Sequence, residues 1–234
     1  MDVAVRDRRI LANPARGVNL PRRIAKEHRY LIHSEVGRLA SNAGKYALLV
    51  NVFAYTGLRW GEAIGLRVKD VDLGRRRLNV SVNAVEHGGR LDIGTPKSHK
   101  RRAVPFPEFL LPDLESATQG KSRDDLVFSD EFGQHMKRTR VSAGSRSWFK
   151  TALKNSGIDP MTLHDLRHTA ASLAISSGAN VKAIQRMLGH ASAAMTLDIY
   201  ADLFDDDLDA VAEALNLAKA AADVAEMLPA SNAE

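Results

Sequence analysis

The stretch from Thr162 to Leu203 holds the side chains best suited to chemistry in this 234-residue chain. His164 and Arg167 are three residues apart, so they project from about the same side of a predicted helix. His190 and Tyr200 follow further along the chain. One arginine, two histidines and a tyrosine that meet at one point would suit a phosphate group beside a nucleophile. The helix itself is predicted from apolar residues that recur at helical spacing: Leu163, Leu166, Ala170, Leu173 and Ala174.

A second candidate motif is the segment 56–62, with the sequence TGLRWGE. Arg59 follows a glycine turn at the expected start of a short helix, where backbone N–H groups and the helix dipole favour an anion. Its guanidinium adds a fork that matches phosphate oxygens. Glu62 lies three residues on and could hold Arg59 or cap the helix. Taken alone, the motif is also consistent with a structural Arg–Glu pair.

The elements that must position these residues predict a mixed α+β fold, mainly α-helical, with a small three-stranded antiparallel sheet. Strands are predicted from the segments LNVSVNAV (78–85), LDIGT (91–95) and RRAVPF (101–106), with Lys97 in the loop between the second and third strands. The stretch 162–203 forms two helices, broken at Gly178 and Asn180, and then a shorter helix that carries Tyr200. Further helices are predicted over residues 31–43 (capped near Ser34), 45–55, 60–66, 107–118 and 142–156.

Composition sets bounds on the kind of protein. A hydrophobic fraction of 44% and a charged fraction of 26% are ordinary for a globular chain. The absence of cysteine excludes disulfides, thiolate chemistry and Cys-ligated zinc. No apolar run approaches membrane-spanning length and no signal peptide is visible, so we expect a cytoplasmic protein.

The net charge of +5 is unevenly distributed along the chain. Residues 1–30 carry a net +5, whereas residues 205–234 carry a net −7. A basic body with an acidic tail is compatible with a polyanionic partner. This charge distribution alone is equally consistent with an ordinary basic protein that has no polyanionic partner.

Several of these pieces together resemble the catalytic domain of the tyrosine recombinases, the phage integrase family. The matching pieces are TGLRWGEAIGLRVKDVD, TPKS, HDLRH, LGH and the tyrosine of TLDIY. They occur in the family's order and at its typical separations, over about residues 30–203. No single piece is specific, but their combination is. The resemblance implies the tyrosine recombinase catalytic-domain fold.

The resemblance also implies a role for each residue that matches a family motif. Arg59, Arg167 and His190 would bind the non-bridging oxygens of the scissile phosphate, while Glu62 would support the site without touching DNA. Attack on a phosphodiester builds negative charge on these oxygens, so preorganised cations are the main requirement. Two arginines and a histidine can supply that charge without a metal.

For the nucleophile, the resemblance implies that Tyr200 forms a 3′-phosphotyrosyl bond and that His164 assists its proton transfer. A phenol with a pKa of about 10 is mostly protonated at neutral pH, so it needs a nearby acceptor or a strong cationic field. Lys97 resembles the lysine that protonates the departing 5′-oxygen, which requires a depressed lysine pKa. His168 matches a common second histidine, for which a structural role is expected.

Further DNA contacts are expected from the basic run KSHKRR (97–102), although a solvated run is a close alternative. The residues assigned to DNA binding, there and in the N-terminal segment, are Lys100, Arg101, Arg102, Arg22 and Arg23.

No cofactor or metal is expected. His164 and His168 are four residues apart and could in principle bind zinc. However, no third ligand has suitable spacing, and Arg167 would oppose a cation. A covalent phosphotyrosyl intermediate would conserve the phosphodiester energy, so rejoining would need neither ATP nor Mg²⁺.

The expected domain organisation has three parts. Residues 1–29 would form a basic interdomain linker, the end of a missing core-binding domain. Residues 30–204 would form the catalytic domain, and residues 205–234 an amphipathic helix and tail with an acidic first turn. That helix would either pack on its own domain or dock on a neighbouring protomer.

The function expected from these features is site-specific DNA recombination through paired cleavage and a Holliday junction, as in phage integration and excision. Expected partners are double-stranded DNA attachment sites, a homotetramer assembled from monomers on synapsed DNA, and a host bending protein or excisionase. The alternatives are a type IB topoisomerase-like activity, a non-catalytic DNA-binding protein and a metal-dependent nuclease.

Overall fold

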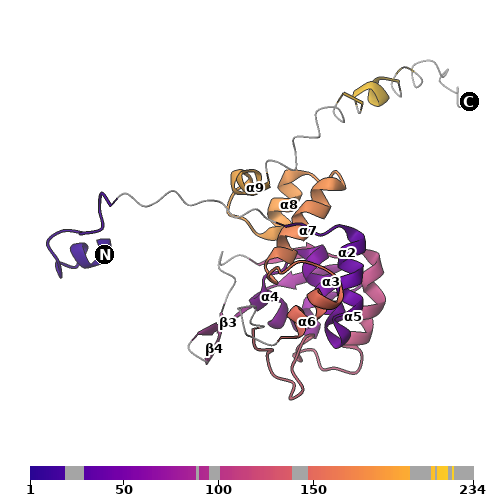
Figure 1. Cartoon of the computed structure of the whole chain (residues 1–234), viewed down its shortest axis with the longest axis horizontal. Coiled ribbons are helices and arrows are strands. Elements are labelled where there is room, and N and C mark those ends of the chain that lie inside the picture. Colours follow the sequence, from indigo (N-terminus) through magenta and orange to yellow (C-terminus); the bar gives the residue numbers. More distant parts are fainter. Residues whose placement is uncertain are drawn as a thin grey trace, which may run out of the picture.

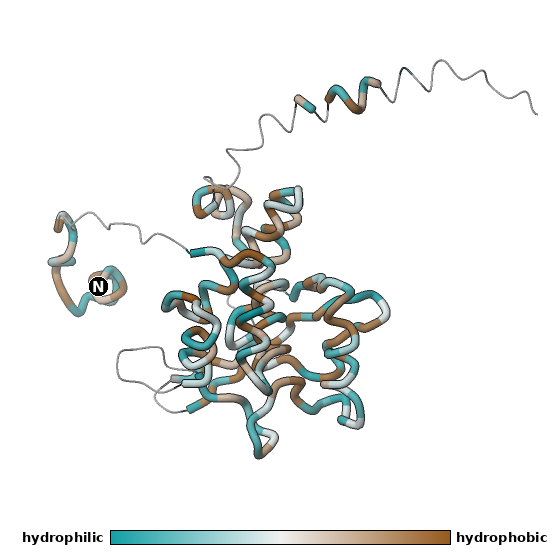
Figure 2. The backbone as a smooth tube through the Cα atoms, turned by 45° about the vertical axis from the view of Figure 1, so that its right-hand side comes forward, coloured by the Kyte–Doolittle hydropathy of each residue, from teal (hydrophilic) through white to brown (hydrophobic). Residues whose placement is uncertain are grey.

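The computed structural model describes residues 1–18, 29–87, 90–94, 101–138, 147–200, 212–213, 215–220 and 223. Within these ranges most of the chain forms a helical body, with strands on one side of it (Figure 1). Hydrophilic and hydrophobic segments are interspersed along the chain of this body (Figure 2). None of the helices in the described ranges is both long and apolar enough to cross a membrane.

The first helical group comprises α2 (His33–Ser41), α3 (Ala47–Thr56) and α4 (Trp60–Ile64). Helix α3 is the most apolar of the three and packs against α2 and α7 (Asp165–Ser176). Its buried residues are Leu49, Val50, Val52, Phe53, Ala54 and Thr56.

Helix α3 ends at Gly57, whose φ of +63° suits glycine. The chain therefore turns sharply and starts α4 directly beside the end of α3.

The second helical group comprises α5 (Leu111–Thr118), α6 (Trp148–Asn155), α7, α8 (Val181–Leu188) and α9 (Ala193–Tyr200). Most buried residues form one large apolar cluster, and a smaller cluster lies between α7, α8 and α9. The smaller cluster consists of Ala171, Ile175, Ile184, Leu188 and Tyr200. The side chain predicted to be the nucleophile is therefore also a core residue of this corner of the fold.

Within the described ranges, the strands form two separate antiparallel sheets. The strand order β1 (Val71–Asp72), β2 (Arg77–Val80), β5 (Arg102–Pro105) makes the first sheet. The hairpin of β3 (Asn83–His87) and β4 (Arg90–Gly94) makes the second, and it projects from the body beside α4 (Figure 1).

The composition of the predicted sheet was therefore wrong in detail, although a small three-stranded antiparallel sheet is present. The predicted strand 78–85 is split, because the chain leaves the first sheet at Ser81, whose hydroxyl donates to an Asp70 carboxylate oxygen at 3.3 Å. It then continues as β3, which pairs with β4. The third strand of the sheet is β1, which was not predicted.

The predicted helices occur with shifted ends. Helix α2 starts at His33 and its N-cap is Ile32, whose backbone N–H donates to the Glu35 carboxylate at 3.1 Å, so the cap lies just before the Ser34 around which it was predicted. Of the predicted helix 142–156, the described part is α6, capped by the Ser147 hydroxyl; residues 139–146 lie outside the described ranges.

The segments at either end of the chain are described in part. The N-terminal segment, expected to be a basic linker, contains the short helix α1 (Asp2–Arg6), which buries none of its residues. In the predicted tail helix, the described residues within 212–223 are helical and exposed.

Candidate active site

Arg59 and Glu62 form the first part of the site at the N-terminus of α4. The Glu62 carboxylate accepts from the Arg59 backbone N–H at 2.8 Å and from its guanidinium at 2.9 Å. Glu62 is only 2% exposed, whereas Arg59 remains partly open to solvent. Glu62 therefore holds Arg59 from the buried side of the site. The rest of the Arg59 guanidinium remains accessible to solvent.

Arg102 binds the other side of the same carboxylate. Its two terminal nitrogens donate to the two Glu62 oxygens at 2.8 and 2.7 Å, and its Nε donates to the Met187 carbonyl at 3.0 Å. Burial alone would raise the pKa of Glu62, but the hydrogen bonds and charges of Arg102 and Arg59 outweigh it and lower that pKa. Glu62 is thus an anion held between two guanidinium groups.

Arg167 on α7 is the most deeply placed cation of the site. It is 3% exposed, and its terminal nitrogens donate to the carbonyls of Gly57 at 2.5 Å and Leu188 at 2.6 Å. Burial, together with the charge of Arg59, lowers its pKa to about 9, so it stays positively charged at neutral pH. One side chain therefore joins the turn before Arg59 to the turn before His190.

His190 follows Gly189, a residue with φ of +66° that ends α8. Its Nδ1 lies 2.9 Å from the Thr196 hydroxyl, and its backbone N–H donates to the Gln185 carbonyl at 3.1 Å. Burial and the charge of Arg167 lower its pKa to about 4. The imidazole is therefore neutral at pH 7, with its orientation set by Thr196.

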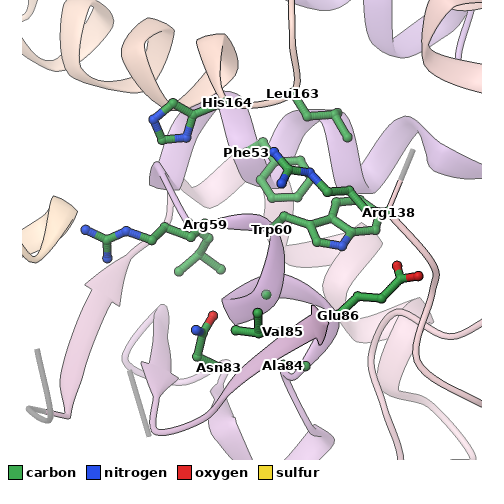
Figure 3. Close-up of a pocket in the computed structure, with 12 residues that line it drawn as sticks. Phe53, Arg59, Trp60, Asn83, Ala84, Val85, Glu86, Arg138, Leu163 and His164 are labelled. Carbon is green, nitrogen blue, oxygen red and sulfur yellow. The ribbon is translucent and has the colours of Figure 1, made fainter. Parts of the chain in front are cut away.

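His164 lies at the start of α7 and lines a cavity of about 240 Å³ with Arg59, Trp60, Glu86 and Arg138. Figure 3 shows the Arg138 side chain extending over Phe53 and Trp60 toward His164. Burial and the charge of Arg167 lower the pKa of His164, and Arg59 and Arg138 act in the same direction. This cavity is the open, cationic side of the site.

Tyr200, the last residue of α9, is 1% exposed. Its hydroxyl lies 2.9 Å from Nδ1 of His168, which is itself buried. The ring of Tyr30 lies nearby, with 6.4 Å between the two ring centroids. Burial raises the pKa of Tyr200 to about 12, although the charge of Arg167 acts in the opposite direction.

The structure thus brings together the described members of the predicted site: Arg59, Glu62, His164, Arg167, His190 and Tyr200. Lys97 lies outside the described residues, as do the predicted DNA contacts Lys100, Arg22 and Arg23. Arg101 is exposed and lines a surface hollow with other basic side chains, among them Arg67, Lys69 and Arg123.

Three features of the site were not predicted from the sequence. Arg102 was assigned to DNA binding, yet its side chain is 10% exposed and bound to Glu62. The hydrogen bond of His168 to the Tyr200 hydroxyl was not predicted either, and it is compatible with the structural role expected for His168. Arg138 was not singled out, and no motif around it would have identified it.

Comparisons with known proteins agree on one family. A sequence model of the phage integrase family matches residues 28–206. The putative prophage phiRv2 integrase of Mycobacterium tuberculosis is 30% identical over 203 residues, which cover 84% of this chain and 54% of that protein. Tyrosine recombinase XerD of Halalkalibacterium halodurans is 31% identical over 174 residues, 71% of this chain and 52% of that protein. The chain thus spans about half the length of these curated relatives.

Solved structures show the same fold. The Tn1549 transposon integrase, in complex with transposon right end DNA, matches with a TM-score of 0.74 and 23% identity, over 92% of this chain and 75% of that one. The crystal structure of XerA recombinase matches with a TM-score of 0.57 and 28% identity, over 80% of this chain and 65% of that one.

Proposed function

Because this chain belongs to the phage integrase family, we propose that it supplies the catalytic part of a site-specific DNA recombinase. It would cut and rejoin DNA strands through a 3′-phosphotyrosyl intermediate and a Holliday junction. The observation that carries the proposal is the placement of Arg167, whose hydrogen bonds join the Arg59 turn to the His190 turn beside the buried Tyr200.

Phosphate binding in this proposal falls to Arg59, Arg167 and His190. Negative charge builds on the non-bridging oxygens during in-line attack, and cations already in place stabilise it without further reorganisation. The Arg167 guanidinium is held by two backbone carbonyls, so its position is fixed before DNA arrives. His190 is neutral at pH 7 and would act as a hydrogen-bond donor rather than as a cation.

Covalent transfer in this proposal starts at Tyr200. Its oxygen attacks the phosphorus, the bond from phosphorus to the 5′-oxygen breaks, and the phenolic proton leaves to an acceptor in the site. The departing 5′-oxygen takes a proton, for which we propose Lys97. Attack by a 5′-hydroxyl on the phosphotyrosine reverses these steps and restores a phosphodiester, with no net change in the number of bonds.

The remaining parts of the proposal concern the DNA substrate, the oligomeric state and the accessory proteins. We propose double-stranded attachment sites as the substrate, bound with help from the exposed Arg101 and from Lys100, Arg22 and Arg23. We further propose a homotetramer on synapsed DNA that forms from monomers, an accessory bending protein or excisionase, and a role in phage integration. The proposed chemistry uses neither metal nor cofactor and takes place in the cytoplasm.

A suicide substrate tests the proposal. DNA of the attachment site carries a nick next to the cleavage position, so the cut fragment diffuses away and the protein stays covalently bound. We expect a covalent adduct that forms equally well in EDTA and is lost in Tyr200→Phe. An adduct of undiminished yield in Tyr200→Phe would show that another residue is the nucleophile. Cleavage that requires a divalent metal would instead favour a nuclease.

A further inference from the structure

Arg102 is the first residue of β5, and its guanidinium connects three elements of the site. Two nitrogens bind the Glu62 carboxylate on α4 at 2.8 and 2.7 Å, and the third binds the Met187 carbonyl on α8 at 3.0 Å. All three guanidinium nitrogens therefore have a partner within the protein, and the side chain is only 10% exposed. This arrangement leaves little of Arg102 for a DNA phosphate.

On the α4 side, Arg102 acts on Arg59 through one shared carboxylate. Glu62 binds both the backbone N–H and the guanidinium of Arg59, at 2.8 and 2.9 Å. Because Glu62 is buried, its position depends on the cations that bind it. A shift of Glu62 would therefore move Arg59 with it.

On the α8 side, Arg102 packs against the turn that leads to His190. Met187 precedes Leu188, whose carbonyl accepts from Arg167 at 2.6 Å. A Cβ atom added to Gly189 would lie 3.1 Å from the Arg102 side chain, so the turn and the guanidinium are in close contact. Arg102 thus directly contacts the groups that hold the predicted phosphate ligands. These groups are Glu62, which binds Arg59, and the end of α8, which binds Arg167 and precedes His190.

Stability alone is a poor explanation for this buried ion pair. Removing two charges from water costs so much that well-packed apolar residues often serve as well or better. Arg102 also adds a positive charge beside Arg167 and His190, and this charge lowers the pKa of both. What only an arginine offers here is a planar fork that holds a carboxylate and a carbonyl in one fixed geometry.

We propose that Arg102 is a positioning residue, which sets the separation of Arg59 and His190 around the scissile phosphate without contacting DNA. This inference rests on the proposed function and deepens it. It also replaces the expectation that Arg102 belongs to the DNA-binding patch.

The main test compares cleavage of two suicide substrates by Arg102→Ala and the parent chain. One substrate has the natural scissile phosphate, and the other has an uncharged methylphosphonate there, which needs less cationic stabilisation. Misplacement by about 1 Å costs roughly 100-fold in rate, so we expect a loss of about that size on natural DNA and of only a few-fold on the neutral substrate. An equal loss on both would overturn the inference.

Two further variants separate positioning from charge and from folding. Arg102→Lys keeps the charge but not the fork, so we expect it to lose nearly as much as Arg102→Ala; parent-like cleavage would contradict us. The double variant Arg102→Met, Glu62→Gln removes both buried charges together and should stay folded, with its circular dichroism unchanged. We expect slow cleavage from this folded protein, and parent-like cleavage would overturn the inference.

DNA affinity provides the matched control, because Arg101 is the exposed neighbour of Arg102. Loss of one phosphate contact reduces the salt dependence of binding by about one unit of slope. We expect that reduction for Arg101→Ala and none for Arg102→Ala; the same reduction in both would make Arg102 a DNA contact. If the parent chain forms no adduct at all, that result would instead refute the proposed function, because it involves no Arg102 variant.

Discussion

The hydroxyl of Tyr200 lies 2.9 Å from Nδ1 of His168, and both side chains are buried. A phenol in this position cannot meet a phosphate from solvent without some local movement. Its burial also keeps it protonated, because the pKa of Tyr200 is raised to about 12. The protein therefore holds the proposed nucleophile neutral and hydrogen-bonded.

We predict that His168→Ala slows formation of the covalent adduct by about fivefold. A neutral hydrogen bond contributes about 1 kcal/mol, and 1.4 kcal/mol corresponds to a factor of ten in rate. The measurement is single-turnover cleavage of saturating suicide DNA. The chain offers a matched control, since His33 Nδ1 also lies 2.9 Å from a tyrosine hydroxyl, that of Tyr55. Equal rates for His168→Ala and His33→Ala would show that the Tyr200 contact does not matter for cleavage.

A second prediction concerns alkaline pH. Tyr200 keeps its proton in the folded chain up to about pH 12, whereas a tyrosine in the unfolded chain ionises near 10. Between these values the folded state binds more protons, so stability falls as the pH rises through this window. Ultraviolet titration of the parent minus Tyr200→Phe should show one tyrosine that ionises near pH 12. A difference spectrum with its midpoint at pH 10 would show that the phenol is solvated.

A third prediction concerns acid pH, where the lowered pKa of His190 should affect stability. Its pKa is lowered to about 4 in the folded chain, against about 6.5 in an unfolded one. The unfolded state then binds more protons between pH 6.5 and 4, so stability is lost as the pH falls through that range. Nitrogen NMR of the imidazole should report a neutral ring at pH 6 in the DNA-free protein. A protonated ring at that pH would contradict the burial seen for His190, and His190→Asn identifies its signal.

Among the described residues, the sequence predicted which side chains meet, because each motif carried its own spacing and a shared family order; Lys97 lies outside these residues. The sequence could not predict how these side chains are supported. Arg102 lies in the basic run KSHKRR, where nothing local distinguishes a buried arginine from a solvated one. Its partner Glu62 is 40 residues away in the chain, so only the tertiary structure reveals the pair.

The error in the sheet has a similar cause. Alternation of apolar and polar residues continues through Ser81 and Val82, so the sequence looks like one strand from 78 to 85. The two strands are separated by tertiary contacts, since the Ser81 hydroxyl donates to Asp70 and the Ala84 backbone lies against Gly61 of α4. The local pattern of apolar and polar residues does not indicate either contact.

The contact between α4 and β3 gives the last prediction. A Cβ atom on Gly61 would lie 2.4 Å from the Ala84 carbonyl oxygen and 2.4 Å from the Asn83 side-chain oxygen. Backbone cannot yield easily at that distance, so Gly61→Ala should lower the free energy of unfolding by about 1–3 kcal/mol, as overpacking does. It should also slow cleavage, because α4 begins next to Arg59.

The control for Gly61→Ala is Gly37→Ala in α2, where the added Cβ would have no atom within 4 Å. Alanine favours a helix interior over glycine by about 1 kcal/mol, so this variant should be slightly more stable than the parent and cleave DNA at the parent rate. Chemical denaturation of both variants gives the comparison. If Gly61→Ala were as stable and as active as Gly37→Ala, the close approach of α4 to β3 would not be what holds Arg59 in place.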